Sequence, residues 1–200
     1  MYSSAVRTSV LIFSLLWVFP LASAESTFPD YPVTSAQKCS VSAENKGVTV
    51  GLTPVEDSQK QTIYFRAQLK KNGFVPVFIV IENGTGSDAL LFDKTKITYG
   101  AANSSIPSVH IGPGAKKLVA IDLIPFAGPV VAPQIAAPAS IVRQNLMKKE
   151  IQSKTLAPGE SASGFLYIPI DKNAPRGKIV LQVPISKAGT DETFDLNLTF

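Results

Sequence analysis

Hydrophobic and polar residues alternate along much of the chain with a period of two, which is typical of strands that bury one face and expose the other. This alternation covers four stretches, residues 48–53, 62–69, 179–185 and 194–200. Two further stretches, 74–81 and 165–170, are apolar at almost every position, which predicts central strands buried on both faces. With short apolar stretches at 90–92 and 97–99, the chain has seven or eight strands, the pattern of an antiparallel β-sandwich.

The connection between stretches 62–69 and 74–81 contains Asn72-Gly73. Asn-Gly between two apolar stretches favours a tight hairpin, because a type I′ turn needs positive φ at both central residues. The alternative is a helix over 58–71 that ends just before the glycine. Alternation over eight residues favours the strand and hairpin, and the helix remains the competing hypothesis.

Residues 118–153 interrupt the strand pattern and predict an insertion in the sandwich. Within them, the stretch 123–142 has twenty residues and no charge, which is long enough to span a bilayer. Four prolines recur in it every four or five residues, and each removes a helical hydrogen bond, so a lone spanning helix is not expected. We expect an extended, Pro-rich apolar segment packed over one end of the sandwich.

The alternative for this segment is an exposed apolar lip that contacts lipid or a partner protein. Its outermost side chains would be Phe126, Val130, Val131 and Ile135. A short helix is expected to follow, capped by Ser140 and running to about Ser153. The residues predicted to face inward from this helix are Ile141, Leu146 and Ile151.

The first 24 residues have the pattern of a secretory signal peptide. Arg7 is their only charge, an apolar run covers 10–19, and Ala22-Ser23-Ala24 provides a small-residue cleavage site. The expected organisation is a signal peptide over 1–24, a flexible polar segment over 25–46, and a single sandwich domain over 47–200. The protein is therefore expected to be exported, either periplasmic or secreted.

Cys39 is the single cysteine of the chain, so no internal disulfide can form. It lies fifteen residues beyond the expected cleavage site, whereas a lipoprotein carries its lipidated cysteine at the mature N-terminus. We therefore expect an unpaired thiol in the flexible segment and a protein that is not a lipoprotein.

Composition and charge limit the chemistry. The chain is 45% hydrophobic and 17% charged, with a formal net charge of +4. Its densest basic clusters are only pairs of lysines, without the positive stripe and stacking aromatics typical of nucleic-acid binding. One Cys and one His are too few to form a Cys/His metal site. We therefore expect the protein to bind neither a metal nor a cofactor.

No constellation of residues predicts catalysis. His110 has no nucleophile elbow near it in sequence, and the acidic residues lie in turn-like contexts where solvated carboxylates are common. Asp122 lies in an apolar stretch, and we expect it to have a structural role. Asn83, Asn103 and Asn197 each begin an N-x-[ST] triplet, which would accept a glycan in a eukaryotic secretory route but would have no consequence in a bacterium.

Two parts of the chain carry a recognisable motif. The first comprises 64–69, 73–77 and 81–83, and the second comprises Leu156-Ala-Pro158-Gly159 and Gly164-Phe165-Leu-Tyr167-Ile-Pro169. Together they resemble uncharacterised bacterial envelope proteins with a predicted immunoglobulin-like sandwich. The resemblance covers roughly residues 48–200 and implies a fold and a compartment, but no activity and no functional residue. Many of those proteins are lipoproteins, and this chain departs from them by lacking the lipidation cysteine.

These observations predict an all-β protein: a single immunoglobulin-like antiparallel β-sandwich with a Pro-rich apolar insertion and one or two short helices. The expected function is that of an exported envelope protein that is not an enzyme but a binding or scaffolding module. Its partner would be an envelope protein or another envelope component, and not nucleic acid. The alternative is a membrane- or lipid-associating protein that makes peripheral contact through 123–142.

Overall fold

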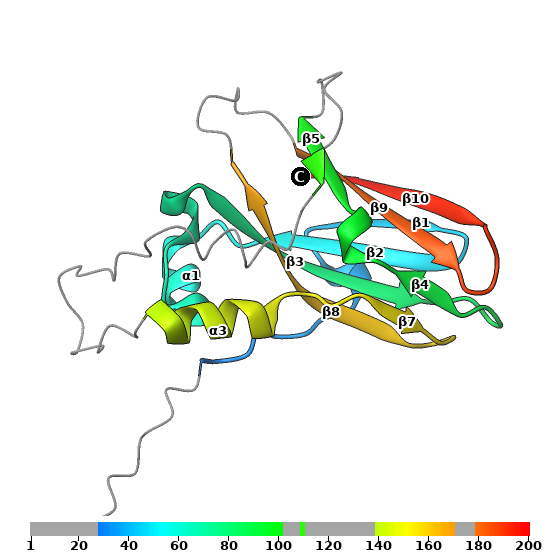
Figure 1. The fold of residues 1–200 in the computed structure, drawn as a ribbon, viewed down its shortest axis with the longest axis horizontal. Helices are drawn as coiled ribbons and strands as arrows, with labels where there is room; N and C mark the ends of the chain where they lie inside the picture. Colours follow the sequence, from blue (N-terminus) through cyan, green and yellow to red (C-terminus); the bar gives the residue numbers. More distant parts are fainter. Residues whose placement is uncertain (1–27, 102–108, 111–138, 171–178) are drawn as a thin grey trace, which may run out of the picture.

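A computed structural model describes residues 28–101, 109–110, 139–170 and 179–200, which form two antiparallel sheets packed face to face (Figure 1). The first sheet has the order β1 (Val41–Asn45), β2 (Val48–Pro54), β3 (Phe74–Asn83) and β8 (Ser161–Pro169). The second contains β4 (Leu90–Phe92), β5 (Thr98–Ala101), β6 (Val109–His110), β7 (Lys154–Leu156), β9 (Ile179–Lys187) and β10 (Thr193–Thr199). The predicted all-β sandwich is confirmed.

The main core lies between the two sheets and is built from the alternating positions. It contains Val48, Val50 and Leu52 of β2, alternate residues 75–81 of β3, and alternate residues 181–185 of β9, all nearly inaccessible to solvent. Each such side chain contributes roughly 1.5–3 kcal/mol by leaving water. The period of two therefore specifies which face of each strand points inward.

β3 is the central strand of the first sheet and is buried on both faces, as its continuous apolar run predicts. Its other face packs against a second cluster formed with two helices, α1 (Ser58–Phe65) and α3 (Ala139–Lys149). Three short 3₁₀ segments complete the described elements: η1 (Ala36–Lys38), η2 (Leu69–Asn72) and η3 (Lys94–Lys96).

The predicted strand over 62–69 and the hairpin at Asn72-Gly73 are wrong. The competing helix over 58–71 is correct for 58–65, where α1 ends at the left-handed Arg66 and the separate segment η2 follows. Asp57 caps α1 by accepting a hydrogen bond from the Lys60 N–H at 2.7 Å. Gln61 is fully buried, donates to the Val55 carbonyl at 2.7 Å and accepts from the Lys70 N–H at 3.0 Å. Satisfying a buried amide in this way holds the helix on the sheet and outweighs the local alternation.

The two-residue hairpin turn lies instead at Lys46-Gly47, where both φ angles are positive, +50° and +77°. It joins β1 to β2, so residues 41–45 of the segment expected to be flexible are an edge strand of the sheet. The flexible segment expected over 25–46 therefore does not describe these residues.

Gly73 adopts φ +82° as the cap of η2, a left-handed conformation that costs a residue with a Cβ about 1 kcal/mol or more. We expect Gly73→Ala to lower the free energy of unfolding by about 1 kcal/mol in a urea titration. Gly86→Ala is the matched control, because a Cβ there would meet no atom within 4 Å. Equal stability of the two variants would contradict the left-handed cap.

Pro184 occupies a break in the hydrogen-bonding ladder of β9. On one side β9 pairs continuously with β10, but on the other β5 pairs with residues 179–182 and β4 with residues 185–187. Pro184 falls between these two partners, where the missing N–H of proline leaves no ladder bond unmade. The proline thus lies at an interruption of the pairing inside the sheet.

A helix is present where one was predicted after Ser140, but α3 begins at Ala139 and ends at Lys149, so Ser140 lies inside the helix and is not its cap, and the helix stops short of Ser153. Leu146 and Ile151 are buried as expected, but Val142 takes the inward place predicted for Ile141, which is only partly buried. The remainder of the predicted insertion, including most of 123–142, lies outside the described residues. None of the helices in the described ranges has the length and apolar character needed to cross a membrane.

Candidate binding surfaces at the two ends of the sandwich

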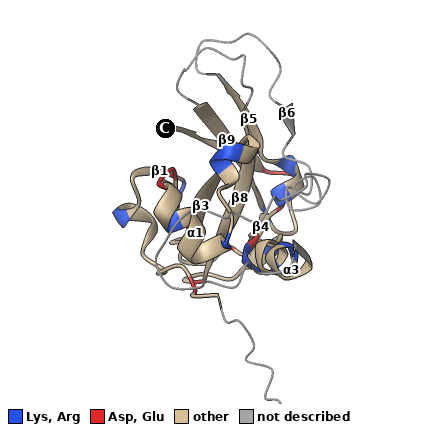
Figure 2. Ribbon diagram, turned by 90° about the vertical axis from the view of Figure 1, so that its left-hand side faces the viewer, with Lys and Arg blue, Asp and Glu red and all other residues tan. Residues whose placement is uncertain are grey.

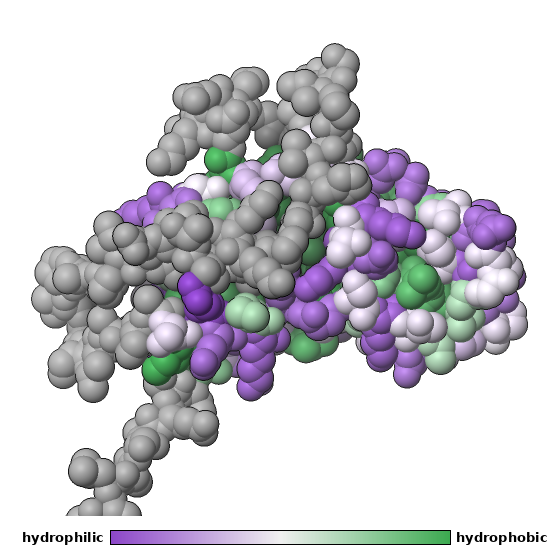
Figure 3. Space-filling view, viewed as in Figure 1, coloured by the Kyte–Doolittle hydropathy of each residue, from purple (hydrophilic) through white to green (hydrophobic). Residues whose placement is uncertain are grey.

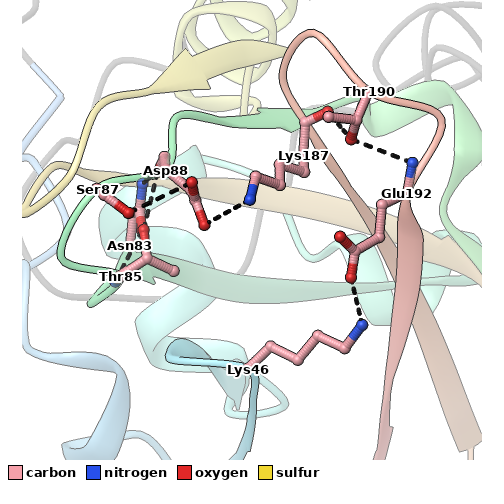
Figure 4. Close-up of polar contacts among 8 residues, drawn as sticks. All are labelled: Lys46, Asn83, Thr85, Ser87, Asp88, Lys187, Thr190 and Glu192. Carbon is pink, nitrogen blue, oxygen red and sulfur yellow. Dashed lines mark hydrogen bonds and ion pairs between the residues drawn. The ribbon is translucent and has the colours of Figure 1, made fainter.

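Four strand connections gather at one end of the sandwich, on the right in Figure 1, and we call this the polar loop end. The connections are residues 46–47, 84–89, 157–160 and 188–192. Binding residues are often found on loops that a rigid sheet positions in this way. Figure 4 shows the polar contacts that join these loops.

Asn83 is the hub of the polar loop end and is 1% exposed. Its amide donates to the carbonyls of Asp88 at 2.8 Å and Leu156 at 3.0 Å, while its oxygen accepts from the Thr85 N–H at 3.0 Å and the Thr85 hydroxyl at 2.5 Å. With both amide hydrogens bonded and the side chain buried, Asn83 cannot accept a glycan in the folded chain. The first N-x-[ST] triplet is thus a structural motif that ties the 84–89 loop to the end of β7.

Two ion pairs cancel charge at the same end (Figure 4). Lys46 bonds Glu192 at 2.5 Å, and Lys187 bonds Asp88 at 2.9 Å. The hydrogen bond from Lys46 lowers the pKa of the Glu192 carboxyl, and the bond to Asp88 raises the pKa of Lys187. Both pairs face solvent, so they orient side chains more than they stabilise the fold. These contacts fix the loops to one another. The four connections contain Lys46 against Asp88, Glu160, Asp191 and Glu192, so they carry no excess of positive charge.

Other described carboxylates also serve as caps of turns. Asp93 accepts hydrogen bonds from the Thr95 N–H at 2.9 Å and the Thr95 hydroxyl at 2.8 Å, and these bonds lower its pKa. Glu160 accepts from the Ala157 N–H at 3.1 Å, which lowers the pKa of Glu160 in the same way.

The opposite end of the molecule is formed by residues 56–73 and 139–150, which we call the helical end (Figure 2). Beneath it lies an aromatic cluster on the outer face of the first sheet, made of Tyr31, Tyr64, Phe65, Phe78, Phe165 and Tyr167. The Tyr31 ring lies 4.7 Å from that of Phe78 and 4.9 Å from that of Tyr64, between centroids. Offset and edge-on ring pairs of this kind add to the stability of the packing.

Two buried hydrogen bonds attach α3 to this cluster. The Tyr167 hydroxyl donates to the Leu146 carbonyl at 2.8 Å, and the Asn145 amide donates to the Tyr64 carbonyl at 3.0 Å. Burial raises the pKa of the Tyr167 hydroxyl well above its ordinary value, so it stays protonated as the donor. Helices α1 and α3 are therefore held side by side on the sheet.

The helical end concentrates the positive charge of the protein. Its two segments carry seven Lys and Arg residues against three acidic residues, a net of four positive charges that equals the +4 of the whole chain. Figure 2 faces this end and shows Lys and Arg positions on α3 and around α1. The rest of the chain therefore has balanced charge, in keeping with the paired residues of the polar loop end.

Exposed apolar side chains lie among these charges. Four large hydrophobic residues in the described ranges are strongly exposed, and Ile63 of α1 and Met147 of α3 are two of them, at 50% and 44%. A third, Val33 at 72%, lies two residues from Tyr31, which packs on Tyr64. Figure 3 shows hydrophobic and strongly hydrophilic surface next to each other over α3, at the lower left. The surface is both basic and partly apolar.

The residues predicted to contact a partner, Phe126, Val130, Val131 and Ile135, lie outside the described residues, as does Asp122. His110 lies in the two-residue strand β6, opposite Thr98. Cys39 is free and half-buried beside the aromatic cluster, where burial raises the pKa of its thiol. Among the described residues, no three His, Cys, Asp or Glu side chains are grouped so that they could hold a metal ion.

Sequence analysis did not identify the helical end as a surface. The lysine pairs 70–71 and 148–149 are visible in the sequence, but they are separated by more than seventy residues and each pair alone is unremarkable. Only the packing of α1 and α3 on one sheet brings them to the same end. Comparison with protein-family models, with curated proteins and with solved structures found no match.

Proposed function

We propose that the protein is an exported β-sandwich of the cell envelope that is not an enzyme and that binds or scaffolds another envelope component through its helical end. The observation that supports this proposal most is the charge distribution: residues 56–73 and 139–150 hold a net charge equal to that of the whole chain. A patch of one charge sign attracts a partner of the other sign and accelerates its association. The four connections of the polar loop end contain one lysine and four carboxylates, so this end does not attract an anionic partner.

The rigidity of the scaffold supports a binding role. α3 is attached to the sheet by buried hydrogen bonds, and α1 is capped by Asp57 and anchored by the buried Gln61. A surface on such fixed elements loses little conformational freedom when a partner binds. We further propose an immunoglobulin-like arrangement for the sandwich, supported by its two antiparallel sheets and by the motif resemblance of residues 48–200.

The proposed compartment depends on cleavage of the expected signal peptide after Ala24. N-terminal sequencing of the form recovered outside the cytoplasm is expected to start at Glu25-Ser26-Thr27. A start more than three residues away, or a retained Met1, would contradict this site of cleavage.

Co-sedimentation with an isolated envelope fraction tests the binding role of the helical end. Lys60 and Lys148 are exposed there, and the double variant Lys60→Glu/Lys148→Glu is expected to lose most of the bound fraction at low salt. The matched control is Lys38→Glu/Lys96→Glu, which makes the same change in net charge at exposed positions in η1 and η3. If both double variants bind equally, the helical end is not the binding surface.

A further inference from the structure

We infer that the component bound by the helical end is the surface of an anionic lipid bilayer. This inference rests on the proposed function and specifies its partner. It is supported by the exposed lysines and the exposed apolar side chains that α1 and α3 bring to one end of the protein.

The three acidic residues of the helical end are engaged by other groups, and the net of four positive charges already takes their negative charge into account. Glu56 bonds Lys70 at 2.5 Å, Asp57 caps α1, and Glu150 lies 3.3 Å from Lys94 in a pair that is largely buried. Lys60 and Lys148 form no ion pair with any residue in the described ranges and are exposed. These two lysines are available to anionic headgroups.

The apolar side chains distinguish a bilayer from a soluble polyanion. A polyanionic polymer attracts the lysines, but its binding free energy does not benefit from burying Ile63 and Met147, which are 50% and 44% exposed. A membrane interface accepts both kinds of side chain, because basic residues meet the headgroups while apolar residues enter the boundary with the acyl chains. An anionic bilayer therefore uses both the lysines and the apolar side chains of this surface, whereas a soluble polyanion uses only the lysines.

The two helices are too short to cross a bilayer, so their contact with a membrane would be peripheral. α1 has 8 residues and α3 has 11, each far short of the roughly 20 needed to span a bilayer. Both are fixed on the sheet by buried side chains, Gln61 and Phe65 in α1 and Leu146 in α3. The sandwich would therefore rest on the membrane with its polar loop end pointing away.

Flotation with phosphatidylcholine vesicles, with and without phosphatidylglycerol, tests the inference. The experiment uses the folded protein as it is purified from cells. Binding is expected only with phosphatidylglycerol, and it is expected to fall as salt rises and shortens the Debye length from about 10 Å at 0.1 M to about 3 Å at 1 M. Equal binding to both kinds of vesicle would contradict a role for the anionic headgroups.

The lysines are tested by Lys60→Glu/Lys148→Glu. The expected loss of affinity is at least about 30-fold, since each lysine near an anionic surface contributes about 1 kcal/mol. Lys38→Glu/Lys96→Glu, with the same net charge, is expected to bind like wild type. Far-UV circular dichroism and urea midpoints establish that both variants are folded.

The apolar contribution is tested separately by Ile63→Ser/Met147→Ser. We expect about tenfold weaker binding with an unchanged salt dependence, because the charges remain in place. Leu91→Ser is the control, since Leu91 is 41% exposed but lies in β4, outside the helical end. If the serine variants bind vesicles as tightly as the control, the apolar side chains do not enter the membrane and the inference is overturned.

The two proposals fail in distinguishable ways. If the lysine variant loses binding to the envelope fraction but wild type does not float with anionic vesicles, the helical end is a binding surface whose partner is a protein or a polyanionic polymer. That result would overturn the lipid inference and leave the proposed function in place. If wild type floats with anionic vesicles and the lysine variant does not, both proposals are supported.

Discussion

Gly51→Ala is expected to release the N-terminal segment 28–38 from the first sheet and to destabilise the fold by about 3 kcal/mol. Gly51 faces η1 across the outer side of β2, where a Cβ would lie 2.2 Å from the Ala36 carbonyl oxygen and 2.7 Å from the Ala36 Cα. Ala36 is fully buried, and its N–H donates to the Glu82 carboxylate at 3.0 Å. Because the clash is with backbone, no side-chain rotation relieves it.

A urea titration, together with near-UV circular dichroism of the tyrosines, measures this effect. If the segment leaves the sheet, Tyr31 leaves the aromatic cluster that it joins through Phe78 and Phe165, and the near-UV signal changes. Gly100→Ala in β5 is the control, with no heavy atom within 4 Å of the added Cβ, and it should stay within about 0.5 kcal/mol of wild type. Wild-type stability and an unchanged tyrosine signal in Gly51→Ala would contradict the close approach.

Asn83→Asp is expected to destabilise the protein by at least about 3 kcal/mol at neutral pH. The substitution replaces the amide that donates to the carbonyls of Asp88 and Leu156 with a buried carboxylate facing the same two oxygens. Burial and these carbonyls disfavour the charged form, so the pKa of the new carboxyl in the folded state lies above its unfolded value of about 3.9.

The sign of the pH dependence follows from this raised pKa. Because the folded state holds the proton more tightly than the unfolded state, the variant is closest to wild type at acid pH and loses stability as pH rises through the folded pKa. Urea titrations of variant and wild type at several pH values measure the difference. Asn197→Asp is the control, because Asn197 is exposed on β10 and should show a small deficit without this trend. A pH-independent deficit in Asn83→Asp would contradict the buried hub.

Several elements of the fold could be predicted because the information that specifies them is local. The alternation in 48–53 and the continuous apolar run in 74–81 predicted β2 and β3 at nearly their observed bounds. The helix predicted after Ser140 is α3, although it begins at Ala139 and Ser140 does not cap it. In each case neighbouring residues determine which face is apolar, and burying that face supplies most of the stabilisation.

Local information misled where a tertiary contact decided between two structures. Residues 62–69 alternate as a strand does, but the buried amide of Gln61 and the buried ring of Phe65 lie four residues apart, on one side of a helix. The bonds from Gln61 to Val55 and Lys70 exist only in the folded chain, so no window of sequence contains them. The surface formed by the helical end was also absent from the sequence-based predictions.

The sequence by itself determined the all-β class, the period that assigns residues to the inner face, and the turn chemistry of the acidic residues. These properties depend on side chains a few positions apart, whose geometry is the same in any strand or turn. The tertiary structure alone decided that α1 replaces a strand, that Asn83 joins the 84–89 loop to β7, and that the lysines of 56–73 and 139–150 share one end of the molecule. Each of these depends on contacts that form only in the folded chain. Bringing the residues together costs chain entropy, and the free energy gained by burying the two sheets offsets that cost.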